Sequence, residues 1–178
     1  MFRTLIAAFL FLATAVHASA DTYRDRSVPM SVVRTLDLNR YLGRWYEIAR
    51  FPNRFEKGCV GVTADYSLRT DGKIRVLNSC RKNTLDGPLN QADGQATVVA
   101  PGKLSVTFVP WLPFAKGDYW VLYLDPSYQM AVVGEPKGKT GWILARKPKI
   151  SEDDFRKATA ALTANGYDVS KLMMVLQP

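Results

Sequence analysis

Short strand-like runs, separated by connections of alternating length, are the feature that most constrains the fold of this chain. Long connections alternate with tighter ones, which contain Asp-Gly, Pro-Gly or Asp-Pro. Because alternate connections of an up-and-down antiparallel sheet lie at the same end, the tight turns should close one end and the long loops should gather at the other. The pattern predicts an all-β fold, an eight-stranded up-and-down antiparallel β-barrel whose interior can hold one small ligand. The predicted strands lie within about 43–146, at residues 45–51, 60–68, 73–80, 92–99, 104–109, 119–124, 130–134 and 142–146.

The segment after the last predicted strand has the pattern of a helix. Ser151 is a favourable N-cap, acidic residues follow it, and Asn165-Gly166 is a C-terminal signal. One narrow apolar stripe runs along this helix, and it consists of Phe155, Ala158 and Leu162. We therefore expect one C-terminal α-helix at about 152–165, packed on the barrel wall, and a short final strand within 172–176.

The first twenty residues have the pattern of a secretory signal peptide. Arg3 precedes an apolar run at 5–16, and small residues at 18–20 surround a cleavable site. The apolar run is too short to span a bilayer. No cysteine follows it, so the motif of a lipoprotein anchor is absent. We expect cleavage after residues 1–20, and a soluble exported protein, periplasmic, whose residues 21–178 form a single domain.

The chain contains two cysteines, Cys59 and Cys80. An oxidising compartment favours a disulfide between them, and a free reactive thiol is the alternative. A hairpin that places Leu68 opposite Ile74 does not bring the two cysteines directly opposite each other. The bond therefore requires a β-bulge or a position beyond the regular ladder.

The single histidine, His17, lies inside the predicted signal peptide. Removal of this segment leaves no imidazole, which excludes Ser-His-Asp and Cys-His nucleophile arrangements and imidazole zinc sites. Two cysteines cannot supply four zinc ligands. We therefore expect no metal, no cofactor and no catalytic residues.

Three separated motifs carry a resemblance to a known family. They are Gly43-x-Trp45 at the start of the first strand, Leu124-Asp125-Pro126-x-Tyr128 in a tight connection, and Arg146 at the end of the eighth strand. The chain resembles the lipocalin family, in particular its bacterial lipocalin and apolipoprotein D-like branch, from about residue 33 to residue 178. The resemblance implies a barrel whose closed end is held by an Arg–Trp cation–π contact. The residues assigned to this structural closure are Gly43, Trp45, Asp125, Tyr128 and Arg146.

Strand alternation and the resemblance together indicate which side chains face the barrel interior. The resemblance implies that Trp142 and Tyr66 line a ligand pocket, and the period of two supplies the other candidates. The expected ligand-binding residues are Glu47, Tyr66, Val106, Phe108, Tyr119, Val121, Tyr123, Trp142 and Leu144. The alternative is that these residues fill a solid core.

The predicted long loops combine cations with apolar residues. Their cations are Arg54, Lys57, Arg81, Lys82, Lys116, Lys137 and Lys139, and their anions are Glu56, Asp86, Asp118 and Glu135, an excess of +3 (seven minus four). The loop before the sixth strand also contains the apolar run 111–114. This combination suits an amphiphile with an anionic head, and it suits transient contact with an anionic membrane surface. The alternative is a lid over the cavity.

These observations predict a non-enzymatic protein that transports or stores a small hydrophobic or amphiphilic ligand, a fatty acid or lysophospholipid, in envelope lipid maintenance. Two alternatives are a lipid-modifying lipocalin enzyme that uses a cavity thiol and a carrier of another apolar ligand such as a pigment. A nucleic-acid partner is not expected, although the net charge is +8, because the cations are scattered and no recognition motif is present.

Overall fold

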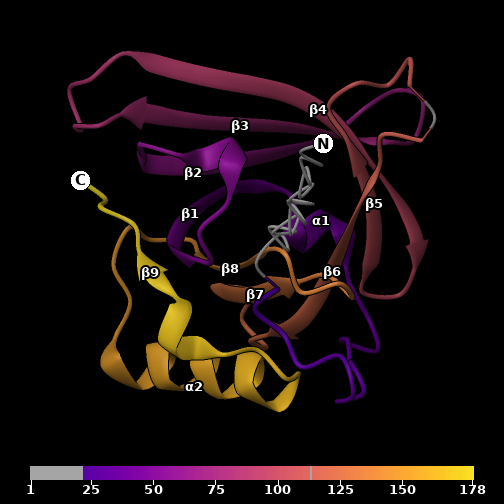
Figure 1. Cartoon of the computed structure of the whole chain (residues 1–178). Coiled ribbons are helices and arrows are strands. Elements are labelled where there is room, and N and C mark those ends of the chain that lie inside the picture. The colour runs from indigo at the N-terminus through magenta and orange to yellow at the C-terminus, as the bar shows by residue number, and fades with distance from the viewer. Residues whose placement is uncertain (1–21, 113) are drawn as a thin grey trace, which may run out of the picture.

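The computed structural model describes residues 22–112 and 114–178, and the predicted signal peptide lies outside these residues. Within these ranges the antiparallel sheet has nine strands, of which eight lie in the order β2-β3-β4-β5-β6-β7-β8-β1 and are closed into a barrel by a β1–β2 pairing (Figure 1). The short ninth strand, β9 (Met173–Met174), pairs with β1 outside this closed set. The predicted eight-stranded up-and-down barrel is therefore confirmed. The strands are β1 (Gly43–Arg50), β2 (Cys59–Leu68), β3 (Ile74–Lys82), β4 (Leu89–Ala100), β5 (Lys103–Thr107), β6 (Gly117–Leu124), β7 (Met130–Gly134) and β8 (Gly141–Ala145).

The two ends of the barrel differ as the connection lengths predict. Tight turns join β2 to β3, β4 to β5 and β6 to β7 at one end, and longer loops occupy the other. A one-turn helix, α1 (Leu38–Tyr41), precedes β1 at the closed end, where the Asp37 side chain accepts hydrogen bonds from the backbone of Asn39 and Arg40. The sequence did not predict α1, because a single turn is too short to show a helical period. A 3-10 turn, η1 (Arg54–Glu56), lies in the first loop of the open end.

The closed end is organised around one guanidinium group. Arg146 stacks on the fully buried ring of Trp45, with 3.8 Å between Cζ and the ring centroid. Its nitrogens also donate hydrogen bonds to five backbone carbonyls, those of Arg40, Tyr41, Leu42, Arg44 and Tyr128. The expected contact between Arg146 and Trp45 is therefore present, and the same group ties α1, β1 and the β6–β7 turn together.

The other motif residues lie around this group. Gly43 adopts φ +92°, a conformation that favours glycine, and a Cβ at this position would lie 3.4 Å from Arg146 Nη1. Asp125 shapes the β6–β7 turn by accepting hydrogen bonds from the backbone of Gln129 and Met130. The Tyr128 hydroxyl in turn accepts a hydrogen bond from the backbone of Asp37 at 3.0 Å.

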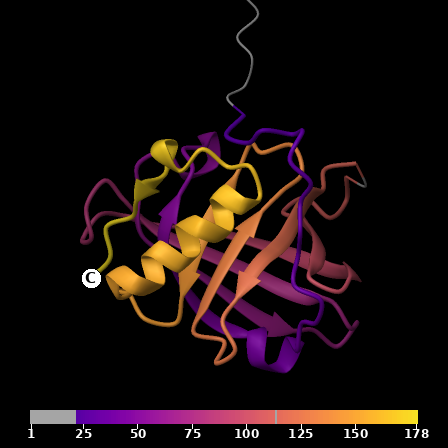
Figure 2. The ribbon, with the colours of Figure 1, turned by 90° about the horizontal axis from the view of Figure 1, so that it is seen from below.

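Two apolar clusters explain why both faces of several strands are hydrophobic. One cluster lies inside the barrel and includes Trp45 and Val121. The second lies between the outer wall and α2 (Glu152–Ala164), whose Ala158 and Leu162 are fully buried. Figure 2 shows α2 lying across the outer face of the barrel. The predicted wall-packed helix is confirmed.

Tyr123 belongs to the outer cluster, so its predicted inward orientation is wrong. The pairing of β6 with β7 shifts register between Val121 and Tyr123. This irregularity changes the alternation, so that Val121 faces the interior, Leu122 and Tyr123 pack in the outer cluster, and Leu124 contacts the inner cluster. A strict period of two cannot anticipate this change.

Cys59 and Cys80 form a disulfide with a Cα–Cα distance of 5.4 Å, which confirms the predicted bond. The β2–β3 ladder begins with Leu68 opposite Ile74 and shifts register between Val60 and Thr63, so the required bulge is also present. The C-terminal segment lies beside this bulge. After η2 (Val169–Lys171) and β9 (Met173–Met174), it hydrogen-bonds to β1 through Val175 and to β2 through Leu176. Among the described residues, no helix is long and apolar enough to cross a membrane.

Replacement of Arg146 by lysine should destabilise the closed end. The lysine ammonium cannot stack as a plane on Trp45 and cannot reach all five carbonyls. We expect Arg146→Lys to lower the free energy of unfolding by on the order of 2–4 kcal/mol, measured by urea denaturation. The matched control is Arg44→Lys, which alters an exposed ion pair with Asp65 and should cost less than about 1 kcal/mol. Equal effects of the two substitutions would show that the Arg146 cluster does not hold the barrel together.

Candidate functional site

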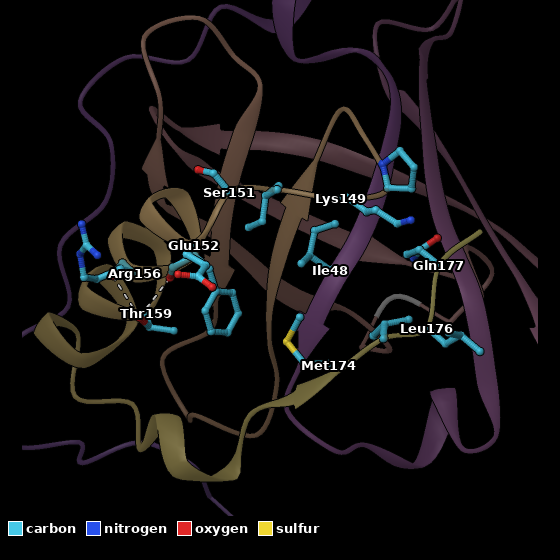
Figure 3. A pocket seen from close by; sticks show the side chains of 13 residues that line it. Ile48, Lys149, Ser151, Glu152, Arg156, Thr159, Met174, Leu176 and Gln177 are labelled. Carbon is cyan, nitrogen blue, oxygen red and sulfur yellow. Dashed lines mark hydrogen bonds between the residues drawn. The ribbon is translucent and has the colours of Figure 1, made fainter.

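The barrel encloses a cavity of about 800 Å³. Its lining combines inward residues of the strands with loop residues of the open end, so its mouth lies among the long loops. A second hollow of about 810 Å³ lies outside the barrel, between α2 and the C-terminal segment, and is lined by residues such as Ile48, Phe155 and Met174 (Figure 3). We assign the candidate site to the inner cavity because it is mostly apolar and contains buried polar groups at two defined levels, as small-molecule sites do.

Three tyrosines form the polar group at the base of the cavity. The Tyr119 hydroxyl lies 2.7 Å from the Tyr41 hydroxyl and 3.1 Å from the Tyr66 hydroxyl. Tyr41 comes from α1, and the other two come from β6 and β2, so the closed end of the fold brings them together. Burial raises the pKa of Tyr66 to about 12, and it also raises the pKa of Tyr41 and of Tyr119. All three are therefore neutral phenols at physiological pH.

A cluster of two carboxyl groups and one guanidinium forms the second polar level. Glu47 is 4% exposed, and its Oε1 accepts a hydrogen bond from Arg50 Nη1 at 2.7 Å. Glu56 Oε2 lies 4.0 Å from Arg50 Nε and accepts a hydrogen bond from Trp142 Nε1 at 3.2 Å. Arg50 also donates to the carbonyls of Glu56 and Cys59. The side chains at this level thus connect β1, η1 and β8.

A register shift in β1 brings Glu47 and Arg50 together. The β1–β8 ladder shifts between Glu47 and Ala49, and both Ile48 and Ala49 then pack in the outer cluster. In a regular strand, residues three positions apart face opposite sides of the sheet. The shift places the Arg50 side chain on the same side as Glu47, and the two form an ion pair. Burial, followed by the neighbouring Glu56, raises the pKa of Glu47 well above its usual range.

Most of the predicted ligand-binding residues lie on the cavity surface. Those that line it are Glu47, Tyr66, Val106, Phe108, Tyr119, Trp142 and Leu144. Val121 lies in the inner cluster but outside the cavity lining, and Tyr123 lies on the outer wall. A binding role for Val121 stays a prediction, whereas Tyr123 packs away from the cavity.

Many cavity residues were missed from the sequence, and the polar ones among them include Tyr41, Glu56 and Asn78. Tyr41 and Glu56 lie on one-turn helices that leave no periodic signal. Asn78 lies on β3 between Val76 and Cys80, which also line the cavity. Strict alternation along β3 could have identified Asn78. Its Oδ1 is buried and has no hydrogen-bond partner in the described part of the chain.

The cationic excess counted over the long loops is not carried by the cavity lining. Of the seven loop cations only Arg54 and Lys116 line the cavity, and Glu56 and Asp118 line it with them. Glu47 adds a further carboxyl group. Trp111, Leu112 and Phe114 do not line the cavity, and Trp111 and Phe114 are 73% and 82% exposed. Among the described residues, no group of three His, Cys, Asp or Glu side chains could hold a metal ion.

The raised pKa of Glu47 predicts a pH-dependent stability. A carboxyl group that binds its proton more tightly in the folded chain loses free energy of unfolding as the pH rises from its ordinary value of 4.5 through its higher folded value. We expect the wild-type stability to fall over this window and Glu47→Gln to flatten the fall, measured by urea denaturation at pH 4.5–8. The exposed Glu152 supplies the control Glu152→Gln, which should follow the wild type. Parallel profiles for wild type and Glu47→Gln would contradict the assignment.

Comparisons with known proteins agree with this architecture. A family model described as a lipocalin-like domain matches residues 36–177. The outer membrane lipoprotein Blc of Escherichia coli is 43% identical over 150 residues, which cover 84% of each chain. Temperature-induced lipocalin-1 of Arabidopsis thaliana is 41% identical over 152 residues, 80% of each chain, and apolipoprotein D of Macaca fascicularis is 36% identical over 156 residues, 82% of this chain and 79% of its own.

Solved structures show the same fold at lower sequence identity. The cockroach allergen Per a 4 superposes with a TM-score of 0.65 at 20% identity and covers 86% of this chain and 97% of its own. Insecticyanin from the tobacco hornworm Manduca sexta superposes with a TM-score of 0.64 at 21% identity and covers 83% and 84% of the two chains. The motifs, the closed barrel, the family match and the relatives above 30% identity lead to one conclusion: the chain belongs to the lipocalin family.

Proposed function

We propose that this lipocalin binds one fatty acid or lysophospholipid in its barrel cavity and transports or stores it in the cell envelope without changing it chemically. Lipocalins bind small hydrophobic ligands. The observation that carries the proposal is the mostly apolar cavity of about 800 Å³, a volume within the range of drug-sized ligand sites. Burial of an acyl chain there supplies the binding energy, at about 25 cal/mol per Å² of apolar surface.

Polar groups at the mouth suit the polar part of such a ligand. Arg54 and Lys116 line the cavity near its opening and offer positive charge to a carboxylate or phosphate. Glu56 and Asp118 lie on the same rim, so the rim accommodates a zwitterionic head as readily as an anionic one. We propose that the signal peptide directs the protein to the periplasm, where such lipids are exchanged between membranes.

The disulfide argues against the alternative of a thiol-based lipid-modifying enzyme. Cys59 and Cys80 both face the cavity, but their sulfur atoms are bonded to each other. A nucleophilic thiolate would require reduction of this bond. The carboxyl cluster lacks a histidine partner, and its guanidinium is occupied by Glu47 and two carbonyls.

A displacement titration tests the proposed ligand class. Delipidated protein loaded with a fluorescent fatty acid should release it on addition of micromolar unlabelled fatty acid or lysophospholipid. Val106→Trp places a large ring in the cavity and should raise the dissociation constant at least about tenfold, because the ligand loses buried apolar contact. Val99 is 60% exposed on the neighbouring β4, so Val99→Trp is the matched control and should bind as the wild type does. If Val106→Trp binds the fluorescent fatty acid as tightly as the wild type does, the ligand lies outside the barrel cavity. If the wild type shows no displaceable binding, the proposal is refuted.

We also propose that the open end touches membranes when the ligand is exchanged. Phe55, Trp111 and Phe114 are each more than 70% exposed on loops of this end. They lie in loops that also contain Arg54, Lys57 and Lys116. Exposed aromatic side chains next to cations are suited to insertion at the surface of an anionic bilayer.

Vesicle co-sedimentation tests this contact. Trp111→Ser combined with Phe114→Ser should reduce binding to vesicles of anionic and neutral phospholipid several-fold at low salt, since two of the three exposed aromatic side chains are lost. Leu68 is 59% exposed at the opposite, closed end, and Leu68→Ser should leave vesicle binding unchanged. Equal binding of the double variant and the wild type would exclude these loops as the contact surface.

A further inference from the structure

The base of the cavity holds a hydroxyl proton that no acceptor in the described chain receives. Tyr41, Tyr66 and Tyr119 carry three phenol protons, and their oxygens make two contacts, both centred on Tyr119. Each contact uses one proton, whichever oxygen donates it. No further hydrogen bond of these three oxygens is found among the described residues. One O–H group therefore remains free to donate.

This free donor faces the ligand space. All three tyrosines line the cavity, and Tyr41 and Tyr66 are 2% and 8% exposed. Apolar side chains also pack around them: Ile74, Val76 and Leu104 lie in the same inner cluster. A buried hydroxyl without an acceptor is unfavourable, so the site favours a molecule that brings an acceptor oxygen to this point.

The charges around the cavity favour an oxygen at the base over one at the carboxyl level. Arg146 lies next to the base and stacks on the same Trp45 ring that contacts Tyr41. Within the described ranges its hydrogen bonds all go to backbone carbonyls. The upper level holds two carboxyl groups and one guanidinium. A partly or fully negative oxygen is therefore attracted to the base by Arg146. At the upper level, Arg50 is already paired with Glu47 and Glu56 and offers less to such an oxygen.

We propose that the three tyrosines form a proton-donor subsite that binds an acceptor oxygen at the deep end of the ligand. This inference rests on the proposed lipid-binding function and specifies its ligand: the buried end is not a plain hydrocarbon. The oxygen has two possible sources. It belongs either to the carboxyl group of a fatty acid that enters head first, or to a hydroxyl or carbonyl group at the far end of an amphiphile that enters tail first.

Two ligands and two variants separate these sources. Hexadecanoic acid and 16-hydroxyhexadecanoic acid are titrated against the wild type, the triple variant Tyr41→Phe/Tyr66→Phe/Tyr119→Phe, and the control Tyr123→Phe, which alters a tyrosine of the outer wall. For head-first entry, hexadecanoic acid should bind the triple variant about fivefold more weakly than the wild type, the ratio expected for one net hydrogen bond. For tail-first entry, 16-hydroxyhexadecanoic acid should bind the wild type about fivefold more tightly than hexadecanoic acid, and the triple variant should lose this preference. Tyr123→Phe should match the wild type throughout.

The other possible results of these titrations also test the subsite. If the wild type and the triple variant bind both acids with equal affinity, the subsite is refuted. The phenols would then contribute only to packing or to hydrogen bonds with water. Failure of the wild type to bind either acid would refute the proposed function rather than this inference. If the triple variant does not fold, the tyrosine Raman doublet of the wild type is measured with and without ligand: a shift toward hydrogen-bond donation supports the subsite, and an unchanged doublet refutes it.

Discussion

The stacking of Arg146 on Trp45 is the interaction on which the rest of the structure depends. A barrel that keeps an open cavity cannot be held together by a solid core, so its ends must supply part of the stability. Here one guanidinium contacts a buried ring and five backbone carbonyls from three separate segments. This contact fixes the closed end and allows the opposite end to be made of loops. The disulfide and the C-terminal segment reinforce the wall where the β1–β2 ladder stops.

The closed end also determines the chemistry of the cavity floor. The helix α1, whose carbonyls bind Arg146, carries Tyr41 into contact with Trp45 and Tyr119. The same interaction that closes the barrel therefore places a phenol group under the ligand space. At the upper level, Arg50 and Glu47 satisfy each other within the wall. The cavity thus presents an apolar middle between two polar levels.

Sequence reasoning predicted the architecture well because it depends on features that repeat along the chain. Alternating connection lengths predicted the barrel and its two unlike ends, and the spacing of Phe155, Ala158 and Leu162 predicted α2. The failures occur where the period breaks. Register shifts in β1 and β6 move Arg50 beside Glu47 and turn Tyr123 outward. Such irregularities depend on how two strands pair, which a single strand sequence does not specify.

We propose that the protein holds one lipid molecule inside its barrel. Native mass spectrometry of the exported protein, purified without delipidation and again after incubation with hexadecanoic acid or a lysophospholipid, tests it most directly. We expect a species heavier than the chain by the mass of one lipid, with a stoichiometry of one lipid per chain. Detection of only the unliganded mass, before and after incubation, would contradict it.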